Sequence, residues 1–138
     1  MDRDKLVELL NDDLSTEFRS IVQYVQHFAT VTGPEYQAVV ELLRPHLGQE
    51  LEHARVLAEQ IAFLGGTPTT VVPEVPSERD PQRALELDLA LEQHQLEGYR
   101  ERVEQAESIG LPDVSEALRP LLEQTQDHVR DLQGALGR

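Results

Sequence analysis

The sequence predicts an all-α protein, a bundle of four helices arranged as two helical hairpins that a long crossover joins. Three observations support this prediction. The 138-residue chain of 15.6 kDa is rich in the helix formers Leu, Glu, Gln, Ala and Arg and contains no Trp. Its apolar residues recur at steps of three and four, and its second half repeats its first. The length fits one domain, residues 1–138, with a single core.

The first hairpin is expected from two long apolar stripes separated by the turn Thr32-Gly33-Pro34, where Gly permits the turn and Pro suits the start of a helix. The first helix, at about 4–30, has the stripe Leu6, Leu10, Leu14, Ile21, Val25 and Phe28. The second helix, at about 35–64, has the stripe Val39, Leu43, Leu47, Ala54, Leu57, Ile61 and Leu64. It ends at Gly65-Gly66, a strong stop signal.

The second hairpin follows residues 67–80, which are rich in Pro, Thr, Ser and Val, lack a helical period and are expected to cross over along the bundle. The third helix, at about 81–108, has the stripe Leu85, Leu89, Leu96, Tyr99 and Val103. After the turn Gly110–Asp113, the fourth helix, at about 113–135, has the stripe Leu118, Leu122, Val129 and Leu132.

The two halves of the chain are related by an offset of 75 residues. Residues 41–57 and 116–132 align without gaps and are identical at 9 of 17 positions. Both segments contain a proline inside the expected helix, Pro45 and Pro120, and each proline is expected to bend its helix. The repeat predicts a bundle with pseudo-twofold symmetry.

Charge and composition exclude several classes of function. The formal net charge of −14 would repel nucleic acid and anionic membranes. The absence of Cys excludes disulfides and thiolate ligands. No apolar run is long enough for a signal peptide or a membrane span. We therefore expect a cytoplasmic protein whose partners are cations or other proteins.

Charged residues interrupt the apolar stripes at matching levels of the repeat. Glu17 and Glu92 stand where leucine would be expected in the first and third helices, and Glu50 does so in the second, with His53 one turn further along the same side. In the fourth helix His128 is equivalent to His53, but Thr125 replaces the second Glu.

Three ionised carboxylates facing one another in a helical core would be strongly destabilising unless a positive charge accompanied them. Helical bundles hold two transition-metal ions with one glutamate from each of two helices and one Glu-x-x-His pair from each of the other two. The alternative is structural: a lone Glu that reaches water, a Glu-x-x-His on a solvated face, or a histidine satisfied in the core.

Other polar residues have separate predictions. Tyr24 and Tyr99 each follow a stripe glutamate by seven residues, so they are expected to point inward and to hydrogen-bond a ligand carboxylate of the opposite half. The alternative is that they are ordinary core aromatics. His27, His46 and His94 have no partner at ligand spacing and are predicted to lie on the surface.

With these residues the chain resembles the ferritin-like superfamily, and bacterioferritin in particular, from Leu6 to Leu132. The resemblance is carried by residues 10–17 with Gln23-Tyr24 and His27, by Glu50-Leu-Glu-His53, by Phe63–Pro68 and by Asp88–Glu92. It implies a ferritin-like four-helix bundle with a ferroxidase centre, in which Glu17 and His53 hold one iron, Glu92 and His128 the other, and Glu50 bridges them.

The departures from the family pattern shape these expectations. With Thr125 in place of a bridging Glu, the centre has three carboxylates. A di-iron centre is expected, and there are three alternatives: a single occupied metal site, a weak second site, or a preference for zinc or manganese. The position of the family's haem-ligating Met is Leu51, so no haem is expected. The chain stops at Arg138 without the family's fifth helix, so a dimer or smaller shell is expected rather than a full cage.

The sequence therefore predicts a protein that oxidises ferrous iron with dioxygen or peroxide for storage or detoxification. Glu17, Glu50 and Glu92 are the expected catalytic carboxylates. The alternative is a ferritin-like module that binds metal or another protein but has lost ferroxidase activity.

Overall fold

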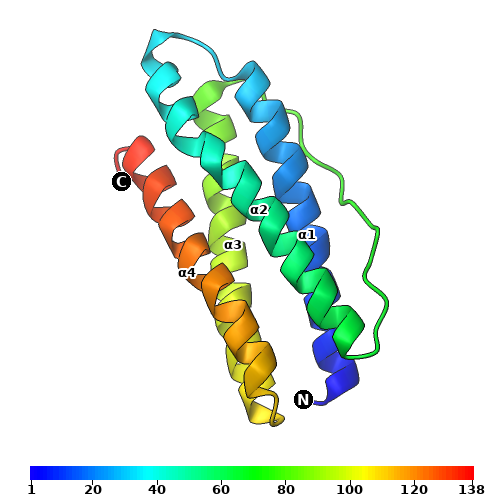
Figure 1. The fold of residues 1–138 in the computed structure, drawn as a ribbon. Helices are drawn as coiled ribbons and strands as arrows, with labels where there is room; N and C mark the ends of the chain where they lie inside the picture. The colour runs from blue at the N-terminus through cyan, green and yellow to red at the C-terminus, as the bar shows by residue number, and fades with distance from the viewer.

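The computed structural model describes residues 1–138 and confirms the predicted bundle of two helical hairpins (Figure 1). Its helices are α1 (Arg3–Thr30), α2 (Gln37–Phe63), α3 (Pro81–Ser108) and α4 (Pro112–Ala135), with a short 3₁₀ turn, η1 (Pro34–Tyr36), before α2. No strand is present. Pro45 and Pro120 lie inside α2 and α4, which both continue through them.

Local sequence signals account for the helix ends. The side chains of Asp2 and Asp80 accept hydrogen bonds from the backbone N–H groups of Lys5 and Arg83, so they cap α1 and α3. Gly65 and Gly110 have positive φ angles of 88° and 76° directly after α2 and α3. At both ends the following residue donates to the carbonyl five residues back, the bond of a Schellman motif.

The two hairpins lie side by side, with α1 against α3 and α2 against α4. The crossover between α2 and α3 runs along the outside of α1 over the length of the bundle (Figure 1). Asn11 of α1 donates to the carbonyl of Thr67 and accepts from the N–H of Thr69, and Ser15 donates to the carbonyl of Val71. These bonds attach the crossover to α1.

The apolar core has two main parts. The larger cluster of buried residues comprises Leu6, Leu10, Leu14, Ala54, Leu57, Ile61, Leu64, Tyr99, Val103, Ala106, Val114, Leu118 and Leu121. The smaller one comprises Leu43, Leu85, Leu89, Leu96, Val129 and Leu132. Buried glutamates and histidines occupy the helix turns between them, as Glu50 and His53 do between Leu43 and Leu57. The bundle thus encloses a polar layer.

The structure corrects two details of the predicted stripes. Val25, expected inside, is 47% exposed, because Tyr24 and His27 take the buried positions of that turn. Leu47 is only partly buried, and His46 occupies the buried stripe of α2 instead. No helix combines the length and apolar character that crossing a membrane requires.

Candidate metal centre

All four helices contribute a side chain to the polar layer. The five residues singled out in the sequence, Glu17, Glu50, His53, Glu92 and His128, are each at most 1% exposed and lie together. Helix periodicity explains the arrangement, because each of the five falls on the inward stripe of its helix. The structural alternative of glutamates that reach water is therefore wrong.

One group of donor atoms comprises Glu17, Glu50 and His53, whose atoms lie within 4.8 Å of one another. The Nδ1 atom of His53 is 3.5 Å from Oε1 of Glu17 and 4.0 Å from Oε2 of Glu50. Carboxylate oxygens and an imidazole nitrogen at these separations could hold one metal ion.

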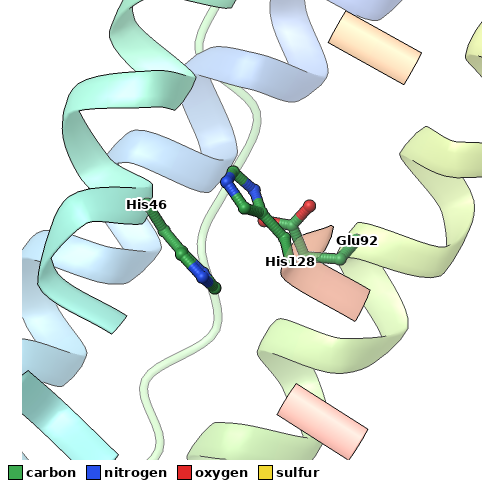
Figure 2. A group of neighbouring side chains, drawn as sticks. All are labelled: His46, Glu92 and His128. Atoms are coloured by element: carbon green, nitrogen blue, oxygen red, sulfur yellow. The ribbon is translucent and has the colours of Figure 1, made fainter. Parts of the chain in front are cut away.

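The second group comprises His46, Glu92 and His128, again with donor atoms within 4.8 Å of one another. Figure 2 shows the three side chains converging from separate helices. The Nδ1 atom of His128 is 2.8 Å from Oε1 of Glu50 and 3.3 Å from Oε1 of Glu92. Glu50 therefore faces both groups, with one oxygen toward each.

The two tyrosines hydrogen-bond carboxylates of the opposite half, as predicted. The hydroxyl of Tyr24 donates to Oε1 of Glu92 at 2.9 Å, and the hydroxyl of Tyr99 donates to Oε1 of Glu17. Each tyrosine is 1% exposed. Such bonds orient a carboxylate for metal binding.

Several buried acceptors in the centre lack a hydrogen-bond partner. They are Oε2 of Glu17, Oε2 of Glu92 and Nδ1 of His53. A buried acceptor without a donor is costly, and all three are atom types that bind divalent transition metals. The donor set therefore fits a bound cation.

Protons neutralise the metal-free centre. Burial, together with the negative charge of Glu50, raises the pKa of Glu92 to about 8 and raises that of Glu17 well above its ordinary value. Burial also opposes ionisation of Glu50, but hydrogen bonds with Glu17 and His128 outweigh it and lower the pKa of Glu50.

The pKa values of the three histidines of the centre shift in opposite directions, depending on their neighbours. Burial disfavours a charged His128, but hydrogen bonds to Glu50 and Glu92 outweigh it and raise its pKa to about 10. Burial lowers the pKa of His46 and of His53. At neutral pH, a metal ion entering the centre would displace protons from Glu92 and His128.

The structure contradicts the surface positions predicted for His27 and His46, which are 3% and 2% exposed. His27 pairs with Asp88 at 2.8 Å, away from the centre, whereas His46 lies in it. His94 is exposed, as predicted. The signal that could have found His46 is spacing, because it precedes Glu50 by four residues and therefore shares its helix face.

Two further residues of α4 lie near the centre. Gln124 accepts a hydrogen bond from Nε2 of His53 at 2.7 Å. Thr125 is buried at the level of the centre, but its hydroxyl donates to the carbonyl of Leu121. The hydroxyl hydrogen of Thr125 is therefore used within the backbone of α4.

A surface cavity of about 590 Å³ lies beside the second group. His46 and His128 line it together with Gln49, Asp127 and Asp131, among others. Gln49 and Asp131 face the Nε2 atoms of these two imidazoles, so the cavity lies on the Nε2 side of the rings.

The comparisons with known proteins agree with this geometry. The sequence model of the family described as "Ferritin-like domain" matches residues 7–138. A ferritin-like, diiron-carboxylate protein from Bacillus anthracis str. Ames has a crystal structure with a TM-score of 0.92 to this chain, 31% identity and 99% coverage of both chains. A bacterioferritin from Rhodobacter capsulatus, described as having a metal-free dinuclear site and haem iron, has a TM-score of 0.86, 27% identity and coverage of 99% of this chain and 86% of that one.

A curated relative is similar over a shorter region. An uncharacterized low temperature-induced protein of Nostoc sp. is 29% identical over 66 residues, which are 48% of this chain and 37% of that protein. The matched region is therefore little more than a third of the relative's length.

Proposed function

The chain belongs to the ferritin-like domain family, close to bacterioferritin, and on this premise we propose that it binds ferrous iron in its buried centre and oxidises it. Glu17 and His53 would hold one ferrous ion, Glu92 and His128 the other, and Glu50 would bridge them. These residues, with Glu17, Glu50 and Glu92 as the catalytic carboxylates, are part of the proposal.

The observation that carries this proposal is the position of Glu50. Its two oxygens face separate donor groups, each with a further carboxylate and an imidazole. A carboxylate in that position can bridge two ions and keep them close enough to react with one oxidant.

The reaction is a two-electron transfer. Each of two ferrous ions loses one electron, and dioxygen that gains two electrons and two protons becomes hydrogen peroxide; peroxide itself is an alternative oxidant. The chain's own contribution is to place the ions in a water-poor layer and to neutralise the ferric charge with its carboxylates. The net charge of −14 favours the approach of cations.

The proposal extends to the fate of the ferric product and to the assembly of the protein. The ferric product would serve iron storage or detoxification in the cytoplasm, without a haem. Bacterioferritin-like assembly of several copies, as a dimer or a smaller shell, would accompany this role. A mass measurement in solution tests the assembly.

The test is an anaerobic titration of metal-free protein with ferrous iron, followed by air and absorbance of the ferric product. We expect two ferrous ions bound per chain and oxidation faster than in buffer. Glu50→Ala should bring the rate down to that of buffer, because it removes the bridge. Glu52→Ala is the matched control, since Glu52 is exposed on the same helix and pairs with Arg55. An unchanged rate in Glu50→Ala would refute the proposal.

A second candidate function is favoured by Thr125, which leaves the centre one carboxylate short of the family pattern. In that case the protein is a ferritin-like module that holds metal, or a protein partner, without oxidising iron. The same titration separates the two, because this module would bind ferrous iron but would not accelerate its oxidation in air.

A further inference from the structure

We propose that His46 is a ligand of the second metal position, beside Glu92 and His128, and that it makes this position selective for zinc. The two positions of the centre would then differ in metal preference. The inference rests on the proposed function only in taking the centre to hold two ions. It does not require that iron be oxidised.

The first support is the common orientation of three imidazoles. In His53 and His128 the Nε2 atoms face the side-chain oxygens of Gln124 and Gln49, at 2.7 and 2.5 Å, while the Nδ1 atoms face the carboxylates of the centre. The offset of 75 relates these two histidines, and it relates the two glutamines as well.

His46 has the same orientation with a stronger acceptor. Its Nε2 lies 2.9 Å from Oδ2 of Asp131, and its Nδ1 faces inward. An ionised carboxylate only accepts hydrogen bonds, so Asp131 fixes the hydrogen of His46 on Nε2 and leaves the lone pair of Nδ1 toward the centre. An imidazole oriented by a carboxylate on its far nitrogen is the usual arrangement of a metal-ligating histidine.

The second support is the single hydroxyl hydrogen that Tyr24 has for both His46 and Glu92. Nδ1 of His46 is 3.2 Å from the hydroxyl oxygen of Tyr24, and that hydroxyl donates to Oε1 of Glu92 at 2.9 Å. Because the hydrogen goes to Glu92, Nδ1 of His46 receives none from Tyr24. Oε2 of Glu92 has no partner either. A cation between His46, Glu92 and His128 would satisfy all of these atoms.

The repeat shows that His46 is an addition to the symmetric part of the centre. Its equivalent in α4 is Leu121, and the equivalent of Glu50 is Thr125. The second half therefore lacks a bridging carboxylate, while the first half supplies an extra nitrogen donor. Because Nε2 of His46 is committed to Asp131, this imidazole can bind one ion only and cannot replace a bridge.

The outcome is two chemically different positions. With Glu50 as the proposed bridge, the first position has two carboxylates and one imidazole, from Glu17, Glu50 and His53. The second position has two carboxylates and two imidazoles, from Glu50, Glu92, His46 and His128. Imidazole nitrogen suits zinc and the other later transition metals, whereas a position with a larger share of carboxylate oxygen suits manganese.

The experiment uses zinc and manganese, which bind without being oxidised under its conditions. Metal-free protein is given one equivalent of Zn²⁺ and then titrated with Mn²⁺, and free Mn²⁺ is measured by electron paramagnetic resonance. We expect the zinc-loaded wild type to bind one Mn²⁺, because zinc occupies the His46 position. Glu17→Gln should abolish that manganese binding.

The decisive variant is His46→Ala, with His46→Gln as a second variant that retains most of the side-chain volume and His94→Ala as the exposed control. Calorimetry should show the tighter zinc step weakened at least tenfold in both His46 variants, and one equivalent of zinc should then compete with Mn²⁺. Zinc binding equal to that of the wild type, or equal weakening of the zinc and manganese steps, would overturn the inference. Failure of iron oxidation in the wild type would leave these binding steps intact, so the two proposals fail separately.

Discussion

Tyr24 and Tyr99 occupy equivalent positions of the repeat. Each donates its hydroxyl hydrogen to a carboxylate on the opposite side of the bundle. These bonds orient Glu92 and Glu17, the outer carboxylates of the two proposed metal positions. Hydrogen-bond partners of this kind are worth roughly a factor of ten to a hundred in metal affinity.

We therefore expect Tyr24→Phe to weaken binding at the Glu92 position by about tenfold or more and Tyr99→Phe to do the same at the Glu17 position. Calorimetric titration of the metal-free variants with Zn²⁺ and Mn²⁺ measures both. Tyr36→Phe is the control, because Tyr36 is only partly buried and lies away from the centre in η1. If both centre variants bound metal like the wild type, the tyrosines would be core aromatics alone.

Individual residues also show how much of the buried polar layer could be predicted from the sequence. The sequence predicted that five polar side chains point inward because each interrupts an apolar stripe, and all five are buried: Glu17, Glu50, His53, Glu92 and His128. His46 was missed because Leu47, beside it, continues the stripe equally well, and a shift of one residue turns a helix by 100°. Only the packing of α2 against α4 decides which of the two faces inward.

Between elements, α1 and α3 are joined by two hydrogen-bonded side-chain pairs that the repeat relates. Arg102 of α3 donates to both oxygens of Asp13 of α1, at 2.8 and 3.3 Å. The equivalent pair is His27 of α1 with Asp88 of α3. The helix spans could be predicted from caps, glycines and periodicity, but these pairs depend on which helices are neighbours.

Arg102→Ala should destabilise the protein by about 3–5 kcal/mol, because it leaves the carboxylate of Asp13 buried without its partner. The side chains of the pair are 8% and 13% exposed. Arg100→Ala is the control: its pair with Glu97 is exposed and should contribute at most about 0.5 kcal/mol. Urea unfolding of the metal-free variants measures the difference. Equal effects of the two substitutions would contradict this account.

For the whole molecule, the protons of the metal-free centre couple folding to pH. The pKa of Glu92 is raised to about 8 and that of His128 to about 10 in the folded state. Between pH 7 and 9 the folded protein therefore holds more protons than the unfolded chain, and linkage requires its stability to fall as the pH rises. In this window the burial-lowered pKa values of His46 and His53 leave both residues neutral in the folded protein.

The metal-free protein should accordingly lose on the order of 4 kcal/mol between pH 7 and pH 9. Thermal unfolding followed by circular dichroism would show a falling Tm over this range. The protein loaded with Zn²⁺ should show a much smaller fall, since the metal has already displaced the protons. Glu92→Gln should also flatten the dependence. A Tm that stays constant or rises in the metal-free wild type would contradict the proton assignment.

The crossover gives the centre a mechanical consequence. Glu17, Glu50 and His53 precede it in the chain and Glu92 and His128 follow it, so ions held as proposed would join the two hairpins as a crosslink. In a chain without cysteine, this crosslink would restrict the unfolded ensemble much as a disulfide does. It would open with chelators, so the rigidity of the bundle would follow the supply of metal.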